Sequence, residues 1–192
     1  MIKWVMTVFF FLFFFDFTQV VFADVFPAGT KYQVCFSPQQ PCANMIVKLI
    51  KNAKHTLFIQ SYSFTSRVIE KALVQALKRG VEVRIICDKS QFSGNFYTSA
   101  RKLYKQGALE WMDYTLNIAH NKVLIADKKI VETGSFNFTN SAQKYNAENV
   151  LIIYDQTLAL RYLGNWYQRQ RLSTPVTSSK FIYYQNRARS PH

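Results

Sequence analysis

The stretch HNKVLIADKKIVETGSFNFTNS, residues 120–141, determines how the rest of the chain is interpreted. Side chains of an extended segment alternate between two faces, so His120 and Lys122 project to the same side. An imidazole can act as a nucleophile or as an acid and base near neutral pH, and the lysine places a positive charge beside it. Gly134 and Ser135 follow at the end of the second strand, where backbone N–H, hydroxyl and amide groups can converge on an anion. Together these residue types suit chemistry on a phosphate ester.

Two short strands joined by a polar turn are expected inside this stretch. The apolar run at residues 123–126 predicts a buried strand, and residues 127–129 predict a turn before the next apolar pair. A histidine beside such a hairpin is usually structural. Here, however, the pattern H-x-K-x(4)-D-x(6)-G-S-x-N is complete, and a chance match at six fixed positions in a short chain is improbable. The six positions are His120, Lys122, Asp127, Gly134, Ser135 and Asn137.

This pattern resembles the HKD signature of the phospholipase D superfamily. The continuation VETGSFNFT, residues 131–139, is similar to the small bacterial endonucleases of that superfamily. The likeness covers most of the chain after about residue 31. Its further segments are QSYSFT (60–65), KALVQALKRGVEVRIICD (71–88), the triplet at 147–149 and the C-terminal helix around Trp166.

The number of motifs has a consequence for assembly. Active sites of the superfamily use two HKD motifs, whereas this sequence has one and no internal repeat. The resemblance therefore implies a homodimer in which two His120 side chains face each other across a twofold axis. One His120 would attack phosphorus and form a phosphohistidine. The second would protonate the leaving oxygen and then activate the water that hydrolyses the intermediate.

The resemblance also assigns roles to the other motif positions. Lys122 and Asn137, assisted by Ser135, would hold the non-bridging phosphate oxygens. Glu148 matches the carboxylate that holds the ring N–H of the nucleophilic histidine and fixes its tautomer. Two positions are interpreted as structural parts of the motif, namely Asp127 and Gly134.

The first 23 residues, MIKWVMTVFFFLFFFDFTQVVFA, predict a secretory signal peptide. Lys3 gives a short positive region, residues 4–15 are apolar, and Ala23 fits the small-residue rule for cleavage. Asp16 interrupts the apolar run, which favours cleavage over a membrane span, with an uncleaved anchor as the alternative. After cleavage the mature chain would reach the bacterial periplasm or the medium, and no stable membrane association is expected.

Charge points to a polyanionic partner. The formal net charge is +13, from 24 Lys and Arg against 11 Asp and Glu. Removal of the first 23 residues leaves it unchanged, because Lys3 and Asp16 cancel. Such an excess would steer nucleic acid or an anionic membrane surface toward the protein, although it could also serve solubility alone.

The cysteines and histidines do not indicate a metal site. Cys35 and Cys42 flank a proline-containing turn, and in an exported protein they could form a disulfide or remain free thiols. Cys87 ends an apolar run and is expected in the core. Three cysteines and three histidines lack the spacing of zinc ligands, so neither a metal nor another cofactor is expected.

Strand and helix patterns alternate along the chain. Strands are expected at residues 31–36, 56–64, 81–87, 109–112 and 149–154, and helices at 45–53, 68–77, 93–106 and 158–167. The β-α-β order predicts an α/β fold with a mixed, largely parallel sheet flanked by helices on both faces. A single domain is expected over residues 24–171. A basic tail would occupy residues 172–192, and it could contact nucleic acid, pack in a dimer or be a weakly ordered terminus.

These observations predict an exported, metal-independent phosphodiesterase. A non-specific endonuclease that cleaves DNA, and RNA by the same chemistry, is favoured by the charge and by the likeness of residues 131–139. A phospholipase D-type lipid phosphodiesterase is the alternative, although no separate segment supplies an apolar interfacial surface. A noncatalytic nucleic-acid-binding protein is disfavoured, because every catalytic position of the motif is present.

Overall fold

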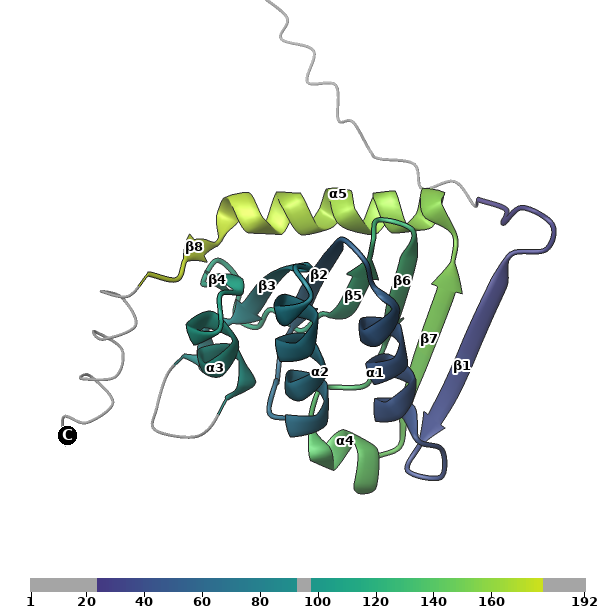
Figure 1. Cartoon of the computed structure of the whole chain (residues 1–192), viewed down its shortest axis with the longest axis horizontal. Helices are drawn as coiled ribbons and strands as arrows, with labels where there is room; N and C mark the ends of the chain where they lie inside the picture. The colour runs from purple at the N-terminus through teal and green to yellow at the C-terminus, as the bar shows by residue number, and fades with distance from the viewer. Residues whose placement is uncertain (1–23, 93–97, 178–192) are drawn as a thin grey trace, which may run out of the picture.

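In the computed structural model, residues 24–92 and 98–177 are described (Figure 1). The expected signal peptide at residues 1–23 lies outside the described residues. Residues 93–97, at the start of the expected basic helix, and residues 178–192 of the expected tail also lie outside them.

Apolar and β-branched runs form the strands of one eight-stranded sheet. The first four strands are β1 (Lys31–Ser37), β2 (Thr56–Ser61), β3 (Glu82–Asp88) and β4 (Leu109–Asp113). The last four are β5 (Lys122–Ala126), β6 (Ile130–Gly134), β7 (Glu148–Tyr154) and β8 (Thr174–Pro175). The hydrogen-bonded order is β1-β7-β6-β5-β2-β3-β4-β8.

The strand directions correct one part of the sequence prediction. β2, β3 and β4 pair in parallel, as expected for strands joined by helical crossovers. The other five pairings are antiparallel, because β5, β6 and β7 follow one another as neighbours and β1 and β8 close the two edges. The mixed sheet is therefore confirmed, but parallel pairing is limited to its β2-β3-β4 part instead of dominating it.

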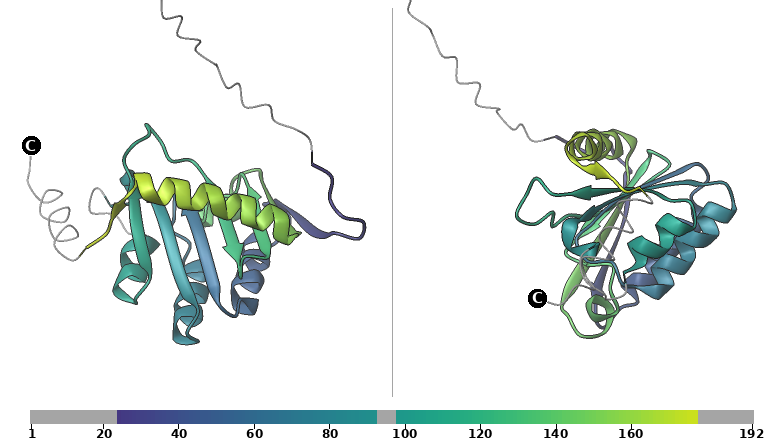
Figure 2. Two further views of the ribbon diagram at one scale, coloured as in Figure 1. Left: turned by 90° about the horizontal axis from the view of Figure 1, so that it is seen from above. Right: turned by 90° about the vertical axis from the view of Figure 1, so that its left-hand side faces the viewer.

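Helices cover both faces of the sheet, as predicted (Figure 2). The helices are α1 (Cys42–Asn52), α2 (Arg67–Lys78), α3 (Ser99–Lys105), α4 (Asn140–Lys144) and α5 (Gln156–Leu172), with a short 3-10 turn η1 (Lys89–Gln91). α1, α2 and α3 lie on one face and α5 crosses the other. Within the described part of the chain, no helix is long and apolar enough to cross a membrane.

The helix periodicity explains which side of each helix is buried. α1 buries Ile46, Leu49 and Ile50, which recur at i, i+3 and i+4, whereas Lys48 and Lys51 are exposed. The apolar side of α1 therefore packs against the sheet, while its lysine side chains lie in solvent.

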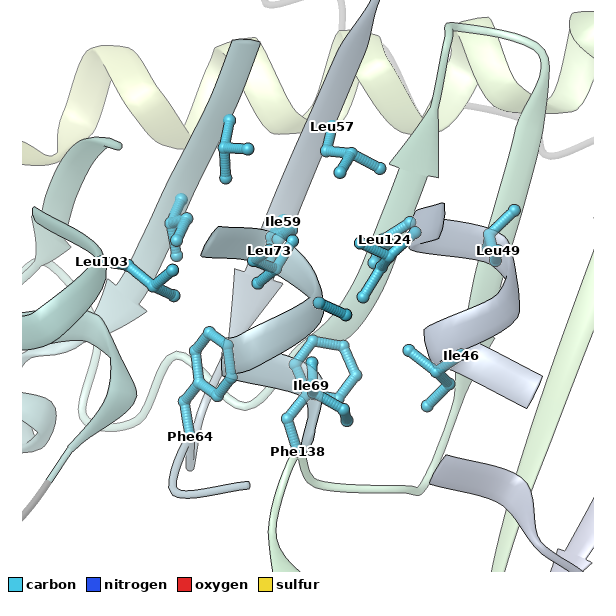
Figure 3. Packing of buried hydrophobic residues seen from close by; sticks show 14 of the residues in the cluster. Ile46, Leu49, Leu57, Ile59, Phe64, Ile69, Leu73, Leu103, Leu124 and Phe138 are labelled. Atoms are coloured by element: carbon cyan, nitrogen blue, oxygen red, sulfur yellow. The ribbon is translucent and has the colours of Figure 1, made fainter. Parts of the chain in front are cut away.

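Buried side chains form one cluster on each face of the sheet. On the α1–α3 side, Ile46 and Leu73 approach Leu124 of β5 (Figure 3). On the α5 side, Trp166 is fully buried and packs edge-to-face on Phe58, with ring centroids 5.0 Å apart. The prediction that Trp166 belongs to the core is confirmed, and replacing such a side chain by alanine typically costs about 3–5 kcal/mol.

The cysteines are also accounted for. Cys35 in β1 and Cys42 at the start of α1 form a disulfide across a sequence separation of 7, which resolves the choice between a bond and free thiols. Cys87 is a free, buried cysteine, as predicted. Burial raises the pKa of its thiol, with nearby Glu110 and Asp88 acting in the same direction.

The folded part extends past residue 171. α5 ends at Leu172, and Thr174 and Pro175 then pair with β4. Val176 is buried in the α1–α3 cluster. The first residues assigned to the tail therefore close the sheet edge beside β4.

Candidate active site

Four strand ends that meet at one end of the sheet form the candidate site. β2 ends at Ser61, which pairs with Lys122 at the start of β5. β6 ends at Gly134, and β7 begins at Glu148. The segment that contains His120 leads directly into β5. This is the end of the sheet at which β7 starts in Figure 1, beside α4.

Alternation in the segment SFNF separates core residues from site residues. Phe136 and Phe138 are fully buried, whereas Ser135 and Asn137 are partly exposed. Phe138 forms a parallel bridge with Phe64 and contacts its ring edge-to-face at 5.5 Å. The aromatic side chains thus fix the backbone that presents Ser135 and Asn137.

His120 and Lys122 are brought together as the spacing predicted. Lys122 Nζ lies 2.8 Å from Nδ1 and 3.0 Å from Nε2 of His120, and it donates to the His120 carbonyl at 2.7 Å. His120 is exposed, but the lysine is only 5% exposed. The site therefore combines an accessible imidazole with a nearly buried cation.

Electrostatics at Lys122 follow from this burial. Removal from water lowers the pKa of the ammonium below the ordinary lysine value, and the negative charge of Glu148 partly opposes that shift. A lysine of this kind is a charged donor that few water molecules screen, which strengthens its attraction for a phosphate oxygen.

Tyr62 is a site residue to which the sequence assigned no role. It follows β2, and its ring centroid lies 4.7 Å from that of His120. Lys122 Nζ lies 5.4 Å from the same ring, within the range of a cation–π contact. The residue belongs to the QSYSFT segment, so the family likeness marked the position without indicating what it touches.

Polar side chains around Ser135 form a hydrogen-bonded cluster beside this pair. Ser135 Oγ donates to Glu148 Oε2 at 2.5 Å, and Asn146 donates to Glu148 Oε1 at 2.9 Å. The backbone N–H of Asn149 donates to Ser135 Oγ at 3.0 Å. Within the described residues no hydrogen bond joins Glu148 to the ring of His120. The role of Glu148 as the partner of that ring stays a prediction.

Gly134 is required by the approach of β7. A Cβ atom at this position would lie 2.2 Å from the backbone oxygen of Asn149. The glycine also has a φ of 156°. Only a residue without a side chain lets β6 and β7 come this close, and the closeness places Ser135 within reach of Glu148.

Asn137 also lies in this region. Its side-chain oxygen is buried and has no hydrogen-bond partner among the described residues. Buried polar atoms are usually hydrogen-bonded, so the unpaired oxygen indicates that the fold does not satisfy all the hydrogen-bonding groups of this amide. Its predicted contact with a phosphate oxygen would come from the N–H₂ group.

Asp127 lies at the opposite end of β5, about 16 Å along the strand from Lys122. Its carboxylate accepts three backbone N–H bonds, from Lys54 at 2.8 Å, His55 at 2.7 Å and Thr56 at 2.9 Å. Desolvation raises the pKa of Asp127, but these bonds outweigh it and the pKa is lowered overall. The signature aspartate thus ties the β5–β6 turn to the start of β2.

The backbone that precedes His120 is also held by side chains that the sequence did not single out. Asp88, 2% exposed, accepts the N–H of Ala119 at 2.8 Å. On the other side, Asn121 Nδ2 donates to Gln60 at 2.8 Å. Both contacts join distant segments, so no local pattern could reveal them.

Metal-binding groups do not gather at this site. Within residues 24–92 and 98–177, no three His, Cys, Asp or Glu side chains come together in an arrangement that could hold a metal ion.

The site combines an exposed histidine, which can act as a nucleophile, with a buried lysine, a hydroxyl and an amide that can stabilise negative charge. These groups suit an enzyme that acts on phosphate esters. A family model described as "Cardiolipin synthase, PLD-like domain" matches residues 46–169. The chain belongs to this phospholipase D-like family and is a phosphodiesterase of that superfamily.

Related sequences support the assignment. The chain is 45% identical over 145 residues to a phospholipase D of Rickettsia prowazekii, covering 74% of this chain and 69% of the relative. It is 28% identical over 166 residues to a mitochondrial cardiolipin hydrolase of Mus musculus, covering 85% of this chain and 72% of the relative.

Two solved structures share the fold. Nuc, a phospholipase D family member from Salmonella typhimurium, superposes with a TM-score of 0.73 at 35% identity, covering 78% of this chain and 99% of Nuc. NucT from Helicobacter pylori superposes with a TM-score of 0.71 at 26% identity, covering 77% of this chain and 99% of NucT.

Proposed function

We propose that this protein is an exported, metal-independent endonuclease that cleaves DNA with little sequence preference and accepts RNA by the same chemistry. It would act as a homodimer, with one His120 from each copy. The observation that carries the phosphodiesterase chemistry is the exposed His120 ring held 2.8 Å from the buried Lys122 ammonium.

Nucleophilic attack would proceed in line. A ring nitrogen of one His120 attacks phosphorus and displaces one ester oxygen, which takes a proton from the second copy's His120. The resulting phosphohistidine is then hydrolysed by a water that the second imidazole deprotonates. Lys122 and Asn137, with Ser135 assisting, stabilise the charge that develops on the non-bridging oxygens.

The helix layer supports nucleic acid as the substrate. Residues 42–79 contain seven basic side chains and residues 99–105 contain three, against one acidic side chain, Glu70. That carboxylate is nearly buried and pairs with Lys102 at 2.7 Å. A surface with so little negative charge attracts a phosphate backbone without reading bases.

A phospholipid is the second candidate substrate, and a specific surface favours it. Strand β1 exposes Tyr32, Val34 and Phe36 on the α5 face of the sheet, at 68%, 47% and 54%. Tyr32, with Leu151 and Ile153 of β7, lines an apolar pocket of about 400 Å³. The sequence showed no separate apolar segment, because these residues are simply the outward-facing positions of an ordinary edge strand. The relative from Rickettsia prowazekii is itself named a phospholipase D.

The test compares both substrates in one buffer with excess EDTA. The mature chain, residues 24–192, is incubated with plasmid DNA, single-stranded DNA or a fluorescent phospholipid. DNA cleavage is expected to fall with rising salt and to drop at least about 100-fold in His120→Ala. His55→Ala, which changes an exposed histidine near the far end of β5, is the matched control and should keep full activity.

Each outcome leads to a different conclusion. DNA cleavage that His120→Ala abolishes supports the nuclease. Lipid turnover with intact DNA would replace the substrate while retaining the phosphohistidine chemistry. Cleavage that continues in His120→Ala, or that stops in EDTA, would contradict the mechanism.

A further inference from the structure

The loop between β4 and β5 exposes apolar side chains immediately before the nucleophile. Leu116 is 45% exposed and Ile118 is 52% exposed, and Tyr114 is 38% exposed. They alternate at positions six, four and two residues before His120. We refer to residues 114–118 as the apolar arm. Large apolar side chains that gather on one exposed segment commonly mark a contact surface.

Buried and charged side chains fix the arm on the body of the domain. Lys89 Nζ donates to the carbonyl of Leu116 at 3.0 Å. The Asp113 carboxylate accepts the backbone N–H of Thr115 at 3.1 Å and is itself paired with Arg169 of α5. The arm is therefore a loop whose backbone is anchored at the Leu116 carbonyl and the Thr115 N–H, and whose apolar side chains are exposed.

The proposed chemistry places a second copy next to this loop. In-line transfer needs the attacking nitrogen about 3–3.5 Å from phosphorus, and the proton donor within a hydrogen bond of the leaving oxygen on the other side. The two His120 ring nitrogens are then about 7 Å apart, so the twofold axis passes roughly 3.5 Å from each ring. Two residues of chain span at most about 7 Å, which keeps Ile118 close to that axis.

We propose that the apolar arm packs against a second copy of this chain and sets the separation of the two His120 side chains. This proposal rests on the homodimeric site proposed above and specifies the surface that forms it. A stable interface buries about 800 Å² on each partner, so the arm forms the part nearest the axis and other residues complete the contact. Burying Leu116 and Ile118 there removes apolar surface from water, while Lys89 and Arg169 keep the loop in place.

Sedimentation velocity over a concentration series tests the arm without reference to any substrate. Ile118→Asp is expected to raise the dimer dissociation constant at least about tenfold, because a charge would be buried against an apolar surface. DNA cleavage should be lost where the variant is monomeric and should return at higher protein concentration. Leu160→Asp changes an apolar residue of similar exposure, 47%, on the outer side of α5, and should match the unmodified protein in both assays.

Cysteine cross-linking gives a second readout that does not depend on a destabilising charge. Ile118→Cys should form a covalent dimer on mild oxidation, and Leu160→Cys should not. Native thiols do not interfere among the described residues, because Cys35 and Cys42 are already bonded and Cys87 is buried.

The failures of the two proposals are distinguishable. An Ile118→Asp variant that dimerises normally would refute the arm and leave the nuclease standing. A monomer with full activity would refute both the arm and the homodimeric site, and would leave only the nuclease activity itself. A protein that dimerises through the arm but leaves DNA intact would refute the nuclease alone. An Ile118→Asp variant that keeps its dimer but loses binding to phosphatidylglycerol vesicles would show that the arm contacts lipid, which also overturns the proposal.

Discussion

Asp127→Ala should destabilise the fold without removing any group of the active site. The substitution leaves three backbone N–H groups without their acceptor. Those of Lys54 and His55 are exposed and can bind water, whereas that of Thr56 is partly buried. Taking about 0.5 kcal/mol for each exposed donor and about 1–2 kcal/mol for the partly buried one gives a loss of about 2–3 kcal/mol. For a domain of this size that lowers the melting temperature by roughly 4–12 °C.

The loss should depend on pH with a defined sign. Because the folded pKa of Asp127 lies below its ordinary value, the stabilisation is fully present above the unfolded pKa of about 3.9. It disappears as pH falls through the folded pKa, when the unmodified protein also protonates the carboxylate. The difference in unfolding free energy between the two proteins should therefore be full at pH 7 and smaller near pH 3.

Urea unfolding followed by circular dichroism at both pH values measures this difference. Asp127→Asn is the matched control, since asparagine tolerates the positive φ of 51° and keeps one acceptor oxygen, so its loss should be smaller. DNA cleavage per folded molecule should stay within a few-fold of normal in both variants. Equal stability at pH 7, a difference that persists undiminished at pH 3, or a large loss of turnover in a fully folded variant would refute the reasoning.

Three further predictions concern the sheet and the disulfide. Gly134→Ala places a Cβ 2.2 Å from the Asn149 oxygen, so urea unfolding should show a loss of about 1–3 kcal/mol and turnover should fall. Burial raises the pKa of Glu132, so stability should decline as pH rises above about 4.3; Glu132→Gln should remove that part of the slope between pH 5 and 8. Replacing Cys35 and Cys42 by serine should cost about 2–3 kcal/mol in the same unfolding assay.

Local patterns were sufficient for the long strands and helices and for the central pair of the site, although they did not predict α4 or β8. The i, i+2 spacing of His120 and Lys122 places both side chains on the same side of the chain, where they are in contact. The alternation in residues 135–138 separates the buried aromatic side chains from the polar side chains of the site. Such periodicities depend only on backbone geometry, which is the same in every strand. For this reason the strands and helices lie close to the predicted residues.

Long-range pairing could not be predicted in the same way. Tyr62 reaches His120 because β2 and β5 are neighbours, and that neighbour relation depends on the whole sheet order. The hydrogen bond from Ala119 to Asp88 spans 31 residues, and the pair of Asp113 and Arg169 spans 56. The excess of antiparallel pairing was missed for the same reason: a β-α-β pattern describes consecutive elements but leaves open where β1 and β7 are placed.

The bond between Cys35 and Cys42 has a consequence for a chain that is exported as proposed. Disulfides persist in oxidising compartments and are rare in the cytosol. A chain that is exported as proposed would cross the membrane before this bond forms, and until then its folding equilibrium constant would be smaller by roughly 30- to 150-fold. The enzyme would gain full stability only after it had left the compartment that contains the chromosome of the producing cell. A structural bond at the edge of the sheet would thereby help to protect that cell from its own product.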